Sequence, residues 1–194
     1  MTTREGSFSG ARRLRIHWQA WLPEGDPRAI VVLAHGASEH AGRYEHVAAR
    51  LVGEGYGVYA IDHRGHGRSE GPRALIDRID NAVADLDSLV CLAAGEHPGA
   101  SVFLLGHSMG GAIAVSYALA HQDRLTGLIL SAPLAALEAA PAPMRLVARV
   151  LSALSPGLPL FPIDPNLVSR DPAVVQAYIE DPLNYHGKLP VRTV

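Results

Sequence analysis

Apolar residues come in short continuous runs along the first 133 residues, and these runs predict strands. Apolar runs of this length, bounded by glycine, proline or polar residues, are typical of strands that are buried on both faces of a sheet. Such runs are found at 29–33, 57–61, 102–105 and 125–130. Residues 14–20 instead alternate between apolar and polar, which predicts a half-buried strand with residues 7–11 as its hairpin partner.

Helical periodicity fills the intervals between these strands. Apolar residues at steps of three and four predict helices over 77–94, over 111–121, and from Tyr44 to a stop at Gly53. Alternating strands and helices imply an α/β fold, in which a mostly parallel sheet is flanked by helices and its strands end at one edge. The residues that we expect at this edge are His35, Asp62, Ser108 and Ser131.

The pattern changes after Pro133, where recurring prolines break the chain into short pieces. Between them lies an apolar stripe at helical spacing, and Arg145 and Arg149 are the only charges from 141 to 162. The stripe consists of Met144, Val147, Leu151 and Leu154, widened by Leu146 and Val150. Such a helix either packs back on the sheet or forms a lid over an apolar channel, and its wide apolar surface favours the lid. We therefore expect a core at 1–133 and a lid or cap region at 134–190.

Composition narrows the class of protein. Of the 194 residues, 48% are hydrophobic and 19% are charged, which is typical of a packed domain. The net charge is −2, and the one basic cluster (Arg12, Arg13 and Arg15) lies in a strand-like segment, so no nucleic-acid partner is expected. The single cysteine, Cys91, is expected to be half-buried on a helix. Neither a secretory signal nor a bilayer-spanning run is apparent, so we expect a cytoplasmic protein.

The strongest chemical signal is the sequence GHSMG at residues 106–110, which lies between a predicted strand and a predicted helix. In this context G-x-S-x-G is a nucleophile elbow, whose sharp turn holds the serine at a helix N-terminus. The two glycines are needed because a Cβ on either side of the serine would clash. Ser108 is the candidate nucleophile, and an acyl-enzyme would form on it. The backbone N–H groups of Met109 and of Ala37, in the loop after the first buried strand, are the candidate oxyanion donors.

Neighbouring polar residues are better explained by structure. His107 adjoins Ser108, but neighbours in a tight turn face different ways. The segment from Asp62 to His66 contains carboxylate and imidazole groups, yet Gly65 and Gly67 favour a hydrogen-bonded structural loop. The histidines at 35, 40, 63 and 66 lack the spacing of a metal site, so no metal is expected.

With these motifs assembled, the chain resembles the α/β-hydrolase superfamily, and within it the monoacylglycerol lipase and lysophospholipase-like group. The resemblance is carried by HGASEH at 35–40 with Arg43 and Tyr44, by DHRGHGRS at 62–69, by GHSMGG at 106–111, and by Tyr178 with DPL at 181–183. It implies a serine carboxylester hydrolase for monoacylglycerol-like or lysophospholipid-like single-chain esters, without a metal or organic cofactor. Ser38 stands where this group often has glycine.

The resemblance also implies roles for individual residues. Ser108 takes the nucleophile position, and Ala37 and Met109 take the oxyanion positions. Glu39, Arg43 and Tyr178 match positions that line the polar end of the pocket and would bind the substrate headgroup. Alternatively, Glu39 and Arg43 pair with each other and brace the loop. A lipid ester substrate further suggests peripheral membrane contact through the lid.

The triad order in this fold is serine, then acid, then histidine. Only His121 and His186 follow Ser108, the first at the far end of a predicted helix and the second in the lid region, and neither suits the base. We therefore hypothesise that the acid and histidine strands of the core are absent from this chain, which alone would be inactive. The alternatives are an acyltransferase, thioesterase or peptidase that uses the same acyl-enzyme, or a non-catalytic protein that binds a lipid or a partner.

Overall fold

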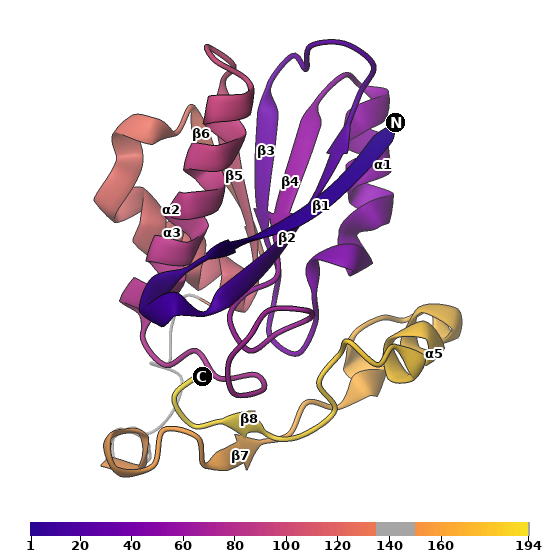
Figure 1. Cartoon of the computed structure of the whole chain (residues 1–194). Coiled ribbons are helices and arrows are strands. Elements are labelled where there is room, and N and C mark those ends of the chain that lie inside the picture. Colours follow the sequence, from indigo (N-terminus) through magenta and orange to yellow (C-terminus); the bar gives the residue numbers. More distant parts are fainter. Residues whose placement is uncertain (135–149, 194) are drawn as a thin grey trace.

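A six-stranded sheet forms the centre of the computed structural model, which describes residues 1–134 and 150–193 (Figure 1). The strand order is β1-β2-β4-β3-β5-β6. The strands are β1 (Thr2–Ser9), β2 (Arg15–Leu22), β3 (Ile30–Ala34), β4 (Gly57–Ile61), β5 (Val102–His107) and β6 (Gly127–Ser131). The last four are mutually parallel, whereas the β1–β2 hairpin joins β4 in antiparallel orientation. The predicted mostly parallel sheet is confirmed.

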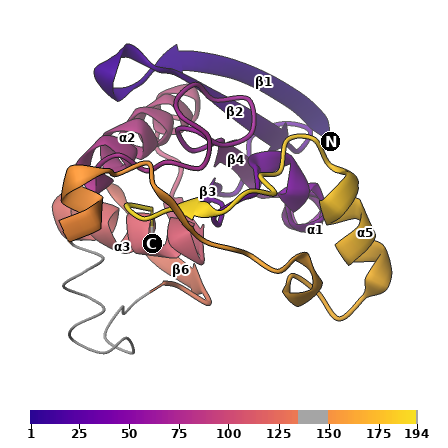
Figure 2. The ribbon, with the colours of Figure 1, turned by 90° about the horizontal axis from the view of Figure 1, so that it is seen from below.

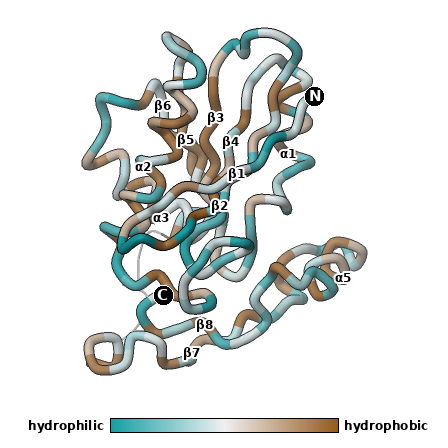
Figure 3. Tube along the Cα trace, viewed as in Figure 1, coloured by the Kyte–Doolittle hydropathy of each residue, from teal (hydrophilic) through white to brown (hydrophobic). Residues whose placement is uncertain are grey.

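Helices cover both faces of this sheet and create two hydrophobic clusters. On one face α1 (Glu45–Gly53) packs over Val31 and Val58. On the other face α2 (Ile79–Glu96) and α3 (Met109–His121) pack over Val32 and Tyr59. All residues of β3 and β4 are buried, as their continuous apolar runs predicted. In Figure 3, brown, the colour of hydrophobic residues, runs along β3, and it also appears on other elements such as α5.

Several local expectations need correction. The first strand is longer than predicted and lies earlier, because its exposed polar residues give no apolar signal. Arg12 and Arg13 lie in the turn η1 (Ala11–Arg13), not in a strand, and both have positive φ. Cys91 is exposed, not half-buried, and its Sγ lies 3.0 Å from Nη1 of Arg124.

Residues 150–193, which we call the cap segment, cross the carboxyl end of the parallel strands (Figure 2). The segment contains a helical turn at 150–154, β7 (Pro159–Phe161), η4 (Pro165–Leu167), α5 (Pro172–Glu180) and β8 (Leu189–Pro190). Part of the predicted apolar stripe (Met144, Leu146 and Val147, with Arg145 and Arg149) falls outside the described residues. Of its remaining members, Val150 and Leu154 are 49% and 80% exposed, and Leu151 is half-buried. In the described ranges, no helix has the length and hydropathy needed to span a membrane.

Candidate active site

Ser108 occupies a sharp turn between β5 and α3. Its backbone angles, φ 50° and ψ −117°, lie in a region that non-glycine residues rarely adopt. The flanking glycines permit this turn, because a Cβ on Gly106 would lie 2.6 Å from the carbonyl oxygen of Gly110, and one on Gly110 would lie 2.2 Å from that of Ala34. The steric requirement expected of these two glycines is confirmed. The nucleophile elbow is therefore formed by β5 and the first turn of α3.

The loop after β3 lies directly against the elbow. A Cβ placed on Gly36 would lie 3.3 Å from Cβ of Ser108 and 3.2 Å from Cδ2 of His107. Ala37 follows in this loop, and Met109 is the first residue of α3. The two predicted oxyanion donors therefore belong to the two segments that meet at Ser108.

The buried carboxylate of Glu39 stabilises this loop through hydrogen bonds. It accepts hydrogen bonds from the backbone N–H of Gly36, at 2.6 Å, and from the hydroxyl of Tyr44, also at 2.6 Å. It also forms an ion pair with Arg43. Burial, together with the Glu39 carboxylate, raises the pKa of Tyr44, so this hydroxyl stays protonated as a donor. The sequence did not predict this hydrogen bond from Tyr44 to Glu39, although the two residues lie close together in one motif.

Tyr178 of α5 joins the same group of side chains. Its hydroxyl donates to the carbonyl of Ser38 at 3.2 Å, and its ring centroid lies 4.8 Å from the guanidinium carbon of Arg43. Burial raises the pKa of Tyr178, which keeps this donor protonated too. The structure thus brings together Glu39, Arg43 and Tyr178. The contacts among them match the bracing alternative, and they place the three side chains beside the loop after β3 (residues 35–40), which we call the oxyanion loop after the role predicted for Ala37.

The turn after β4 is a structural loop, as its glycines predicted. The carboxylate of Asp62 accepts hydrogen bonds from the backbone N–H groups of Ala41 and Arg68 and lies 3.2 Å from Nδ1 of His17. Burial alone would raise the pKa of Asp62, but these hydrogen bonds outweigh it and lower the pKa to about 2. Asp62 is therefore an ionised anchor between β2, β4 and the oxyanion loop.

Three buried histidines, two from the turn after β4 and one from the end of β3, lie close together. The His35 ring is 4.6 Å from the ring of His63 and 5.4 Å from that of His66, between centroids. Burial lowers the pKa of all three, that of His66 to about 3, so they are neutral at pH 7. Both ring nitrogens of His35 bond to the backbone, at the Gly36 carbonyl and the His63 N–H. Within the described part of the chain, no group of three or more potential ligands has metal-site geometry.

In the described residues, no histidine forms a hydrogen bond with the hydroxyl of Ser108. The ring of His107 bonds to the hydroxyl of Ser131 at 3.1 Å. His121 packs on the ring of Tyr117 at the distant end of α3, and His186 packs on Tyr178. Among residues 1–134 and 150–193, we find no hydrogen bond to Oγ of Ser108.

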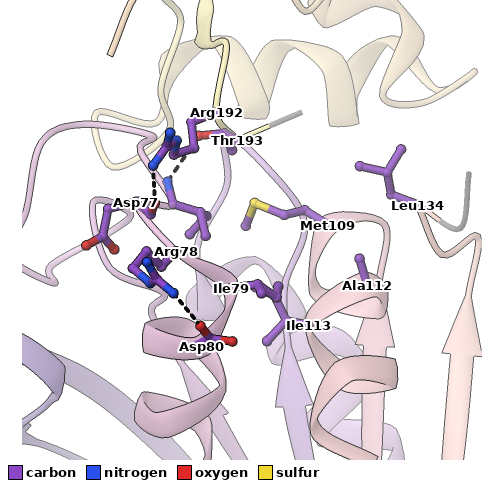
Figure 4. Close-up of a pocket in the computed structure, with 11 residues that line it drawn as sticks. Asp77, Arg78, Ile79, Asp80, Met109, Ala112, Ile113, Leu134, Arg192 and Thr193 are labelled. Carbon is purple, nitrogen blue, oxygen red and sulfur yellow. Dashed lines mark hydrogen bonds and ion pairs between the residues drawn. The ribbon is translucent and has the colours of Figure 1, made fainter. Parts of the chain in front are cut away.

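A cavity of about 340 Å³ opens beside the elbow, on the Met109 side (Figure 4). Its wall is mostly apolar, where α2 and α3 face each other, and Leu134 adds a further apolar side chain. The polar lining residues are Asp77, Arg78, Asp80, Arg192 and Thr193. Arg192 donates to the carbonyl of Asp77 at 3.4 Å. The apolar side chains are Ile76, Ile79, Met109, Ala112, Ile113 and Leu134. The part of the cavity between α2 and α3, beside Met109, therefore suits an apolar group.

Comparison with known proteins identifies the family. The family described as serine aminopeptidase, S33, matches residues 25–194. The monoacylglycerol lipase of Mycolicibacterium smegmatis is 46% identical over 190 residues, which are 97% of this chain and 68% of that protein. The chain belongs to the monoacylglycerol lipase-like group of the α/β-hydrolases. The predicted fold and resemblance are thereby confirmed.

Two further relatives agree with this assignment to the monoacylglycerol lipase-like group. The human monoglyceride lipase is 43% identical over 88% of this chain and 57% of its own length. The crystal structure of the monoacylglycerol lipase from Paleococcus ferrophilus superposes with a TM-score of 0.73 at 36% identity, covering 99% of this chain and 67% of that one. The chain spans between 57% and 68% of the length of the two curated relatives.

Proposed function

We propose that this chain carries the nucleophile, Ser108, of a serine carboxylester hydrolase of monoacylglycerol-like single-chain esters. The observation that carries the proposal is the strained elbow, which holds Ser108 at the N-terminus of α3 against the Gly36–Ala37 loop. Attack of Oγ on the ester carbonyl would form the acyl-enzyme and release the alcohol, and water would then release the acid. The N–H groups of Ala37 and Met109 would stabilise the oxyanion.

The two sides of the elbow suit the two ends of such an ester. The apolar cavity beside Met109 would take the acyl chain. Glu39, Arg43 and Tyr178 lie on the side of the oxyanion loop and would bind a polar headgroup. The names of the relatives support a glycerol headgroup over that of a lysophospholipid. Peripheral contact of the cap segment with a lipid surface is part of the same proposal.

The first test is intact mass of the chain before and after a fluorophosphonate probe, with Ser108→Ala as the control. The described residues place no base at Ser108, so we expect slow or no labelling of this chain. A stoichiometric adduct that is lost in the variant would show that Ser108 is activated here, and it would contradict our hypothesis that the acid and base are missing. Hydrolysis of a monoacylglycerol against a lysophospholipid of equal acyl chain then tests the headgroup.

A peptidase is the second candidate, because the matching family is described as a serine aminopeptidase. Both activities use the same acyl-enzyme and differ in the leaving group. Parallel assays with a monoacylglycerol and an aminoacyl anilide separate them. Preferred cleavage of the anilide would contradict the esterase proposal, and product formation with an added alcohol would indicate acyl transfer.

A further inference from the structure

A histidine of the oxyanion loop is joined to an aspartate of the cap segment. Nε2 of His40 lies 2.7 Å from Oδ2 of Asp181, although the two residues are 141 positions apart. The side chains are 9% and 27% exposed, so the contact is largely shielded from water. Hydrogen bonds to a carboxylate are roughly twice as strong as those between neutral groups. This contact is therefore a strong link between the core and the cap segment.

The second ring nitrogen of His40 shows which partner donates in the hydrogen bond between His40 and Asp181. Nδ1 accepts a hydrogen bond from the backbone N–H of Gly42 at 3.2 Å, so in the neutral ring Nδ1 carries no proton. The proton must then reside on Nε2, which donates to Asp181. Burial would raise the pKa of Asp181, but the hydrogen bond from His40 and the backbone N–H of Leu183 lower it. His40 is thus a donor to an ionised carboxylate.

Two further hydrogen bonds join the same two segments. The carbonyl of Ser38 accepts from the Tyr178 hydroxyl at 3.2 Å and from the backbone N–H of Tyr185 at 3.1 Å. Ser38 has φ 63°, a conformation that costs energy for a residue other than glycine and persists only when its surroundings hold it. Tyr178 and Tyr185 of the cap segment make these contacts with Ser38, which is the residue that follows Ala37.

The part of the cap segment that makes these contacts is itself a rigid turn. Oδ1 of Asp181 accepts from the N–H of Leu183 at 2.9 Å, and the side-chain amide of Asn184 donates to the carbonyl of Tyr178 at 2.9 Å. Tyr178 and Asn184 are both buried. One carboxylate therefore both closes this turn and holds His40.

We propose that Asp181 is a positioning residue, which through His40 keeps the loop from Ala37 to His40 in the geometry that aims the Ala37 N–H at the oxyanion. Glu39 holds the start of this loop at Gly36, while residues 178–185 hold Ser38 and His40, so closure of the cap segment over the carboxyl edge of the sheet completes the oxyanion site. The role of Ala37 rests on the proposed function, whereas the coupling between the two segments does not.

Hydrogen exchange of the 194-residue chain tests the coupling without requiring activity. The variants are Asp181→Ala, Asp181→Asn, which retains an oxygen acceptor for His40, and Asp171→Ala as the matched control. Asp171 caps α5 in the same segment and accepts from the N–H of Ala173, away from the loop. We expect Asp181→Ala to speed exchange at amides 36–42 and 185 by about 10-fold or more. Asp181→Asn should speed it less, and Asp171→Ala should act on α5 alone.

Two outcomes of the exchange experiment would overturn the proposal. One is unchanged exchange at 36–42 in Asp181→Ala, and the other is an equal increase in Asp171→Ala, which would indicate general loosening of the cap segment. Fluorophosphonate labelling provides the second readout: the rate at Ser108 should fall in Asp181→Ala and recover in part in Asp181→Asn. Faster exchange with an unchanged labelling rate would also refute positioning. A wild-type chain that takes no label is the result expected where the base is missing, and the exchange result alone then decides the coupling.

Discussion

At the scale of single residues, close backbone approach explains why glycine is required at the elbow. A Cβ on Gly110 would lie 2.2 Å and 2.4 Å from the carbonyl oxygens of Ala34 and His35. We expect Gly110→Ala to destabilise the chain by about 2–3 kcal/mol, because the end of β3 must move. Gly95→Ala is the control, since Gly95 is exposed in α2 with open space around it, and alanine there should stabilise by about 0.5–1 kcal/mol. Urea unfolding measures both, and equal effects would contradict the steric argument.

Buried histidines make the stability of the chain depend on pH. The folded-state pKa of His66 is lowered to about 3, whereas an unfolded histidine titrates near 6.5. Below pH ~6.5 the unfolded chain binds a proton that the folded chain does not, so this contribution is present at neutral pH and is lost as the pH falls. We expect His66→Asn to reduce the slope of unfolding free energy against pH by about 1.4 kcal/mol per unit between about pH 6 and pH 4. A slope that His66→Asn leaves unaltered would refute the argument.

At the scale of elements, β6 lies at one edge of the described sheet, and most of its residues are exposed, although its apolar run predicted a buried strand. Among the described strands it pairs only with β5, and Leu128, Ile129 and Leu130 are 37–44% exposed. Unpaired edges with apolar side chains promote association with other chains. We expect Ile129→Lys to suppress concentration-dependent light scattering. The control is Leu119→Lys, which changes a more exposed leucine on the helix α3, away from the edge of the sheet. An equal effect there would show that apolar exposure alone, and not pairing of edge strands, drives association.

The elements differ in how far the sequence predicts them, for physical reasons. Buried parallel strands such as β4 were predicted because continuous apolar runs identify them. β1 was placed wrongly because its stability comes from pairing with β2 and not from its own side chains. The helix α5 went unpredicted, although Asp171 followed by Pro172 is a typical N-terminal signal. The contact of His40 with Asp181 depends on a chain reversal over 141 positions, which no local pattern encodes.

The candidate site shows the same difference between features that a local pattern predicts and contacts between distant parts of the chain. Ser108, Met109 and Ala37 follow from local rules, since an elbow and the loop after a strand are defined within a few residues. Glu39, Arg43 and Tyr178 came from the resemblance, and only the structure shows that they contact one another. Their role in binding a headgroup stays a prediction. Sequence therefore predicts the elbow and the loop after β3 more readily than the contacts of the side chains around them.

At the scale of the whole molecule, the cap segment presents apolar side chains at the same end as Ser108. Leu154 and Leu167 are 80% and 83% exposed, although burial of a leucine normally contributes about 2 kcal/mol. Exposed apolar side chains around a binding site are typical of surfaces that contact lipid or protein. A substrate that resides in a membrane would enter from this end of the sheet, so contact with the lipid surface and access to the elbow would use one face.

This argument predicts how membrane binding divides among exposed leucines. The double variant Leu154→Ser, Leu167→Ser should lower the fraction of chain that floats with phospholipid vesicles by about 10-fold or more. The reason is that the two leucine side chains, which would be transferred from water into the lipid, are then missing. Leu119→Ser removes a leucine that is 84% exposed on α3, outside the cap segment, and should leave flotation unchanged. Equal losses in the two variants would indicate non-specific adsorption. Flotation that neither variant alters would mean that the cap segment does not contact the lipid, and substrate would then have to reach Ser108 from solution.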